Sequence, residues 1–165
     1  MEDKIKVYDN FLETNTLNWI NKQLNRPKWS FTGGGISDEV ASKFWHMDGL
    51  ETEDSFVEIY KQNIEQLNPK NTKIKRIYAN GQTATQSGVP HMDDGDTTIL
   101  FFPTYWKHYW GGHLHFWDKG NLTKVVEYKQ NRLVTFPAGI THYAGAPDKS
   151  FIGLRVSLAF KVDNV

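Results

Sequence analysis

The chain has 165 residues, enough for one domain with a hydrophobic core and too few for two ordinary domains. Lysine plus arginine and aspartate plus glutamate number 19 each, so no net charge favours nucleic acid or an anionic membrane as a partner. The absence of cysteine excludes disulfides, thiolate metal sites and cysteine nucleophiles, so any metal site must use His, Asp or Glu.

The first residues, MEDKIKVYDN, lack a basic segment followed by an apolar stretch. No window of the chain approaches ~18 uninterrupted apolar residues, the length typical of a membrane span. We therefore expect a cytoplasmic protein that does not associate with a membrane.

The N-terminal part, about residues 1–70, is predicted to be helical after a short strand at 4–8. Two segments carry apolar residues at helical spacing, and each ends at a proline, Pro27 or Pro69. The glycine-rich segment between them, residues 30–49, is predicted to be an ordered loop. The apolar residues that share one face of each helix are Leu17, Ile20 and Leu24, and Phe56, Tyr60, Ile64 and Leu67.

From about residue 73 to residue 162 the pattern changes to short β-rich runs separated by Gly, Pro and Asn. Seven or eight strands after two helices predict an α+β, mainly β fold: an antiparallel jelly roll with the N-terminal helices packed on one sheet. We expect a single domain over residues 1–165. The runs are KIKRIYA, TTILFF, HLHFW, KVVEY, RLVTF, THYAG and FIGLRVSLAFKV.

The stretch VPHMDDGDTTILFFP, residues 89–103, contains a candidate metal motif. His91 and Asp93 are two residues apart, so on a strand they share a face with Cα atoms ~7 Å apart. His142 from a later strand would complete two histidines and a carboxylate, a set that leaves coordination positions open on non-haem Fe(II). The alternatives are a polar turn built by the aspartates and, more weakly, a calcium loop. The residues from Asp94 to Asp96 are predicted to be a turn under either interpretation.

Arg155 lies in a run whose two faces differ. Leu154, Val156, Leu158 and Phe160 form an apolar face, and the opposite face is small apart from the arginine. If the apolar face packs under the helices, Arg155 points into the barrel, where an unpaired guanidinium calls for an anionic ligand such as a carboxylate. Ser157 shares that face and could add a hydrogen bond. The alternative is a surface arginine on an edge strand.

Together these residues resemble the Fe(II)/2-oxoglutarate-dependent oxygenases, specifically the prolyl 4-hydroxylase-like branch, whose fold is a double-stranded β-helix. The resemblance extends from about Tyr78 to Lys161. It rests on four segments: IYANGQ, WGGHLHFWD, RLVTFPAGITHYAGAP and LRVSLAF.

The resemblance implies that the catalytic residues His91, Asp93 and His142 bind Fe(II) and that Arg155 pairs with the distal carboxylate of 2-oxoglutarate. Tyr78 would be a further cosubstrate contact, as Ser157 would be from its place on the face of Arg155. The implied reaction hydroxylates a prolyl residue in a peptide, or another amino-acid-like substrate, and releases succinate and carbon dioxide. Ascorbate would be a supporting reductant.

Two other functions remain open. His113 and His115, with the segment ending at His142, resemble the cupin metal motifs, but Lys119 and Gly120 stand where a cupin glutamate is expected. If Leu114 and Phe116 fill the barrel, the two histidines face outward.

The second alternative is a metal-free jelly-roll binding module that stacks a sugar or peptide on the aromatic loop at 103–112. In an oxygenase, this loop, Trp45 and the glycines at 33–35 would line the substrate entrance. The aromatic residues proposed to face the substrate in the loop are Trp106, Tyr109 and Trp110.

Overall fold

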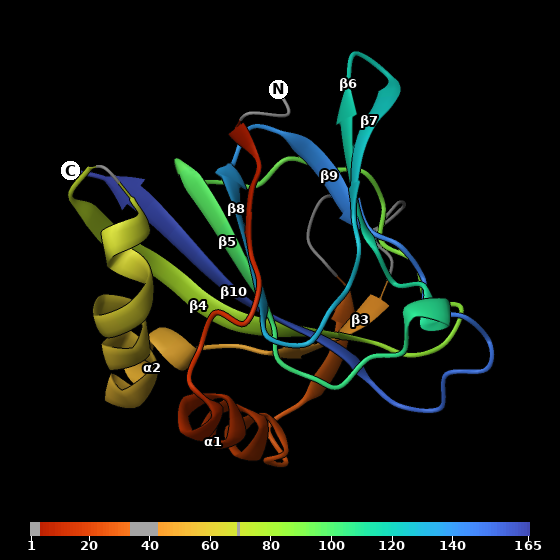
Figure 1. Cartoon of the computed structure of the whole chain (residues 1–165), viewed down its shortest axis with the longest axis horizontal. Helices are drawn as coiled ribbons and strands as arrows, with labels where there is room; N and C mark the ends of the chain where they lie inside the picture. Colours follow the sequence, from red (N-terminus) through yellow and green to blue (C-terminus); the bar gives the residue numbers. More distant parts are fainter. Residues whose placement is uncertain (1–3, 34–42, 69) are drawn as a thin grey trace.

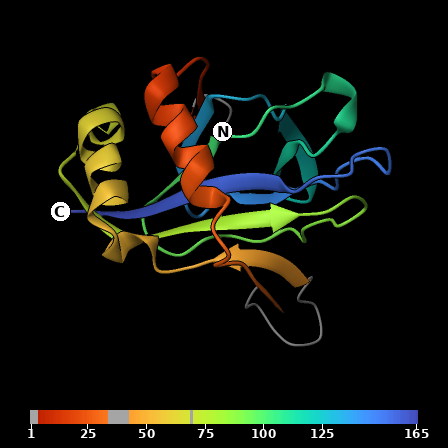
Figure 2. The ribbon, with the colours of Figure 1, turned by 90° about the horizontal axis from the view of Figure 1, so that it is seen from below.

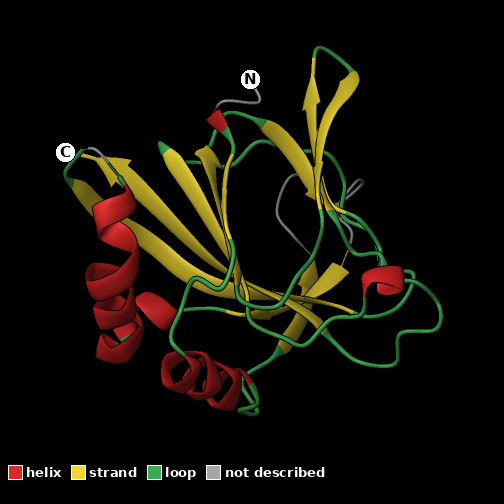
Figure 3. Ribbon diagram, in the orientation of Figure 1, coloured by secondary structure: helices red, strands yellow, loops and turns green. Residues whose placement is uncertain are grey.

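The computed structural model describes residues 4–33, 43–68 and 70–165, and its regular structure is mostly β (Figure 3). Seven strands form a large antiparallel sheet in the order β1-β8-β5-β10-β4-β3-β2, and three form a small antiparallel sheet in the order β7-β6-β9. The strands are β1 (Lys6–Tyr8), β2 (Ser30–Gly33), β3 (Lys43–Met47), β4 (Thr72–Gln82), β5 (Thr97–Phe102), β6 (Leu114–Asp118), β7 (Asn121–Val126), β8 (Arg132–Pro137), β9 (Thr141–Ala144) and β10 (Arg155–Asn164).

The helices cover one face of the large sheet, on the side away from the small sheet (Figures 1 and 2). They are α1 (Thr14–Leu24) and α2 (Asp54–Ile59). The predicted second helix is not uniform, because α2 continues as a π-helical turn, η3 (Tyr60–Ile64), and a 3-10 turn, η4 (Glu65–Leu67). None of the described helices is long and apolar enough to cross a membrane. Further 3-10 turns are η2 (Leu50–Thr52) and η5 (His108–Trp110).

Strand β10 lies in the middle of the large sheet, between β5 and β4, and has two chemically different faces. Its outer face packs against the helices in one buried cluster, as predicted for the apolar residues of this run. Its inner face points toward the small sheet and carries polar and small side chains, all buried. The residues of the outer face are Val156, Leu158, Phe160 and Val162, and those of the inner face are Arg155, Ser157, Ala159 and Lys161.

The prediction of a loop at 30–49 is wrong at both of its ends. Residues 30–33 and 43–47 form the paired strands β2 and β3, which extend the large sheet beyond β4. Apolar periodicity does not indicate these strands, because glycines interrupt the pattern. The residues between the strands, 34–42, lie outside the described residues. With β1 at the opposite edge, the N-terminal part therefore contributes three strands as well as the helices.

Truncation of Phe160 tests the packing of the helices on the sheet. Phe160 is fully buried and its ring centroid lies 5.9 Å from that of Tyr60. We expect Phe160→Ala to lower the free energy of unfolding by about 3–5 kcal/mol, measured by urea denaturation. The control is Leu122→Ala, at a half-exposed position, for which we expect a change below about 0.5 kcal/mol. Equal effects of the two changes would contradict this packing.

Candidate metal centre

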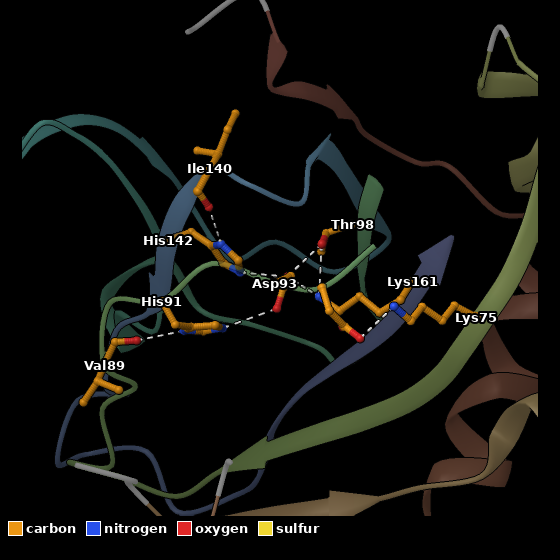
Figure 4. Close-up of polar contacts among 9 residues, drawn as sticks. Lys75, Val89, His91, Asp93, Thr98, Ile140, His142 and Lys161 are labelled. Carbon is orange, nitrogen blue, oxygen red and sulfur yellow. Dashed lines mark hydrogen bonds and ion pairs between the residues drawn. The ribbon is translucent and has the colours of Figure 1, made fainter. Parts of the chain in front are cut away.

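His91, Asp93 and His142 come together between the two sheets (Figure 4). One ligand atom from each lies within 4.8 Å of the others. The backbones of His91 and His142 pair through two hydrogen bonds, 3.0 and 2.9 Å long, which set the two imidazoles side by side. The amide of Asp93 donates to the carbonyl of Ala138 at 3.0 Å, which fixes the segment that carries the carboxylate. The sequence prediction that these three side chains meet is therefore confirmed.

Both imidazoles are oriented by backbone carbonyls. His91 Nδ1 lies 2.8 Å from the carbonyl oxygen of Val89, and His142 Nδ1 lies 2.9 Å from that of Ile140. With each Nδ1 held by a carbonyl, each Nε2 points toward Asp93 and is the ring nitrogen that a metal ion would bind. Two imidazole nitrogens and one carboxylate form a donor set that suits Fe(II) and leaves further coordination positions open.

Asp93 is held by two buried side chains that the sequence analysis did not single out. Lys161 Nζ contacts Asp93 Oδ2, and Thr98 Oγ1 donates to the same oxygen at 2.7 Å. Lys161 Nζ also donates to Thr98 Oγ1 at 3.1 Å, so Lys161, Thr98 and Asp93 form a closed network (Figure 4). This network adjoins His91 and His142, which with Asp93 form the metal triad. The strand alternation that places Arg155 inward also places Lys161 inward, so the same pattern predicts the inward direction of this lysine.

The surroundings of Asp93 favour its ionised form. Burial raises the pKa of this carboxyl group, but hydrogen bonds from His142 and His91 and the charge of Lys161 outweigh it and hold the pKa well below its usual range. Burial lowers the pKa of His91, and the neighbouring Asp93 carboxylate and Val89 carbonyl raise it above its ordinary value. The centre therefore provides a permanent negative charge between two nitrogen ligands.

Arg155 is buried inside the barrel with 1% of its surface exposed, as predicted. Its Nε donates to the carbonyl of Gly112 at 2.6 Å and its Nη1 donates to Gln82 Oε1 at 3.0 Å. The guanidinium carbon lies 4.8 Å from the ring centroid of Tyr128. Within the described ranges no carboxylate contacts Arg155, and burial lowers its pKa to about 10. A buried cation without an acidic partner is costly, so this end of the barrel suits an anionic ligand.

Tyr78 and Ser157 share the inner face of the large sheet with Arg155. Tyr78 pairs with Ala159 and Ser157 pairs with Asn80, which places both between the arginine and the metal triad. The ring centroid of Tyr78 lies 5.9 Å from Lys161 Nζ, and burial together with the charge of Asp93 raises the pKa of its hydroxyl.

The four aromatic residues predicted to face the substrate differ in burial and in direction. Trp106 is buried and packs on Tyr128, 4.4 Å between ring centroids, so it closes the barrel near Arg155. Trp110 lies against Trp106, and Tyr109 is more than half exposed. Trp45 shares the sheet face of the core residue Met47 and packs on Phe31, so it points away from the metal triad.

The cupin-like histidines do not join the centre. Leu114 and Phe116 are buried in the barrel core, so the alternating His113 and His115 face outward, as the sequence predicted. His113 Nδ1 accepts a hydrogen bond from the backbone amide of Tyr128 at 3.2 Å. The ring of His115 stacks on that of Tyr143 at 4.8 Å. Their packing roles explain both side chains without a metal.

Removal of Lys161 tests the charge pairing at Asp93. We expect Lys161→Met to lower the free energy of unfolding of the metal-free protein by about 3–5 kcal/mol, because it leaves a buried carboxylate without its cation. Added Zn(II) should reduce this loss, because the ion supplies the missing positive charge. Chemical denaturation with and without metal measures both effects.

The matched control is Lys75→Met, which removes an exposed lysine paired with the neighbouring Asp94. We expect it to leave the free energy of unfolding nearly unchanged, because solvent screens an exposed ion pair. A loss for Lys161→Met no larger than for Lys75→Met would contradict the buried ion pair.

No protein-family model matches the chain, and no curated protein is similar to it by sequence. Solved structures, in contrast, match nearly the whole chain.

A prolyl hydroxylase from Trichoplax adhaerens, in complex with a hypoxia-inducible-factor peptide, matches with a TM-score of 0.77 and 12% identity over 98% of this chain and 84% of its own. A Pseudomonas putida prolyl 4-hydroxylase has a TM-score of 0.66 and 15% identity over 96% and 92%. HygX from Streptomyces hygroscopicus, with nickel, 2-oxoglutarate and hygromycin B bound, has a TM-score of 0.75 and 8% identity over 98% and 83%.

These three proteins share an architecture, although one is bound to a peptide and another to hygromycin B. The matches extend over both sheets, because they cover 96–98% of this chain. The chain has the double-stranded β-helix fold of the 2-oxoglutarate/Fe(II) oxygenases.

Proposed function

We propose that the protein is an Fe(II)- and 2-oxoglutarate-dependent dioxygenase. It would hydroxylate a prolyl residue in a peptide, or another amino-acid-like substrate, and release succinate and carbon dioxide. The observation that carries the proposal is a pair of incomplete sites in one barrel: a His-Asp-His triad, and a buried arginine that no described acidic residue neutralises.

The two sites lie along the inner face of the same strand, β10, which would allow one ligand to bridge them. Arg155 and Lys161, which contacts the triad, are six residues apart on β10, about 20 Å between Cα atoms. Their long side chains occupy part of that span, and only Ser157 and Ala159 lie between them on the inner face. A dicarboxylate could contact the metal with one end and the forked donors of Arg155 with the other.

The bound iron and 2-oxoglutarate would supply the oxidising chemistry. The chain's own residues would bind and orient them. His91, Asp93 and His142 would hold the metal, and Gln82 and the carbonyl of Gly112 would aim the Arg155 guanidinium.

The walls of the barrel would keep water away from the reacting groups. Aromatic side chains pack around the Arg155 end, and Tyr78 would turn its hydroxyl toward the cosubstrate. The buried aromatic residues at the Arg155 end are Phe102, Trp106 and Tyr128, and Phe116 and Phe136 lie beside His142.

Known proteins of this fold bind different chemical classes. The Trichoplax adhaerens enzyme binds a peptide and HygX binds hygromycin B, so peptides and small molecules are both compatible with the fold. Fold alone does not choose between them.

The first test is 2-oxoglutarate turnover. We expect purified protein with Fe(II), ascorbate and 2-oxoglutarate to release succinate, and Asp93→Ala to abolish the release because a metal ligand is lost. The matched control is Asp94→Ala, which removes an exposed neighbouring carboxylate and should retain the activity. Release that survives in Asp93→Ala but disappears in His113→Ala would replace this proposal with a cupin-type site.

The second test separates the arginine from the metal. Arg155→Gln should weaken 2-oxoglutarate binding about thirtyfold or more, because a buried charged donor is lost, while metal affinity changes less than about twofold. Isothermal titration with an inert divalent metal present measures both constants. Arg132→Gln, which removes an arginine paired with Asp9, is the control. Unchanged 2-oxoglutarate affinity in Arg155→Gln would remove this residue from the site.

A further inference from the structure

We infer that the substrate carries a carboxylate group and that Lys161 binds it. The inference rests on the proposed function, because it concerns the charge of the site when metal and 2-oxoglutarate are bound. The inference limits the substrate to molecules that carry a free carboxylate near the reacting carbon.

The ammonium group of Lys161 lies next to the metal triad. Its side chain is 3% exposed and its Nζ contacts Asp93 Oδ2, the oxygen that lies 3.2 Å from His142 Nε2. An ammonium group has three donors, and two are directed at Asp93 and Thr98. One N–H therefore remains for a ligand.

The charges of the loaded site do not balance without a further anion. The metal would contribute two positive charges, and Lys161 and Arg155 one each. Asp93 and a doubly charged 2-oxoglutarate together contribute three negative charges. One positive charge would remain in a buried site, where an unbalanced charge is costly.

Neighbouring acids do not supply the missing negative charge. Asp94 is exposed and pairs with Lys75 at 3.0 Å, and Asp48 is exposed and pairs with Arg76 at 2.6 Å. In the part of the chain that the structure describes, Asp93 is the one acidic residue in contact with Lys161. Once a metal takes a share of the Asp93 charge, the lysine has no full counter-charge of its own.

The cosubstrate does not fill this role either. In the proposed arrangement one carboxylate of 2-oxoglutarate lies at the metal and the other at Arg155, and molecular oxygen is neutral. The remaining anion is then the substrate. A free amino acid or a chain-terminal residue offers a carboxylate next to its reacting carbons, and an internal prolyl residue does not.

The test uses acetate as the anionic probe and acetamide as its neutral counterpart. Protein loaded with Co(II) and 2-oxoglutarate is titrated with each probe, and binding is followed by calorimetry and by the cobalt absorption spectrum. We expect saturable binding of acetate and none of acetamide. Lys161→Met should weaken acetate binding about tenfold or more, and Lys161→Arg should retain most of it. Lys75→Met should bind acetate as the unaltered protein does.

Thermal unfolding of each variant shows whether it is folded, and Lys161→Gln replaces Lys161→Met if the latter is not. Acetate that fails to bind, or that binds Lys161→Met as tightly as the unaltered protein, overturns the inference; the second result would indicate coordination to the metal alone. If Co(II) or 2-oxoglutarate itself does not bind, the proposed function fails and this inference fails with it. If Co(II) and 2-oxoglutarate bind but acetate does not, only the inference of a substrate carboxylate is refuted.

Discussion

The buried charge of Asp93 is the constraint on which the candidate site depends. A carboxylate in the barrel interior needs hydrogen bonds and a cation, and the chain provides both from separate strands. Thr98 comes from β5, Lys161 from β10 and His142 from β9, so one charged group connects the large and small sheets. The metal site is therefore also a structural contact between the two layers.

Strand β10 organises the rest of the molecule. Its apolar face holds the helices, and its polar face holds both ends of the proposed cosubstrate site. The same alternation of side chains thus places the helix packing on one face and the charged groups on the other. A change on the outer face is expected to affect unfolding, whereas a change at Lys161 on the inner face is expected to affect both unfolding and the charge balance of the site.

Much of the candidate site follows from the sequence because it depends on local rules. The alternation of strand side chains placed Arg155 inward and His113 outward, and the spacing of His91 and Asp93 indicated a shared metal. Other features depend on contacts between distant segments. No local pattern shows that Trp106 packs on Tyr128, or that Trp45 packs on Phe31.

Lys161 and the β2–β3 hairpin show two further limits. Lys161 belongs to the run FIGLRVSLAFKV, whose two faces differ. An apolar pattern nevertheless gives a single lysine near a strand end no special weight. Its importance arises only from the approach of Asp93 across the barrel. The hairpin depends on pairing with β4, and its glycine-rich connection obscures the strand signal.

The most direct test of the central claim is anomalous diffraction from crystals soaked anaerobically with Fe(II) and 2-oxoglutarate. The account predicts an iron peak about 2.0–2.2 Å from His91 Nε2, a carboxylate oxygen of Asp93 and His142 Nε2. It also predicts 2-oxoglutarate density between that peak and the Arg155 guanidinium. Iron bound at His113 and His115, or 2-oxoglutarate bound away from Arg155, would contradict it.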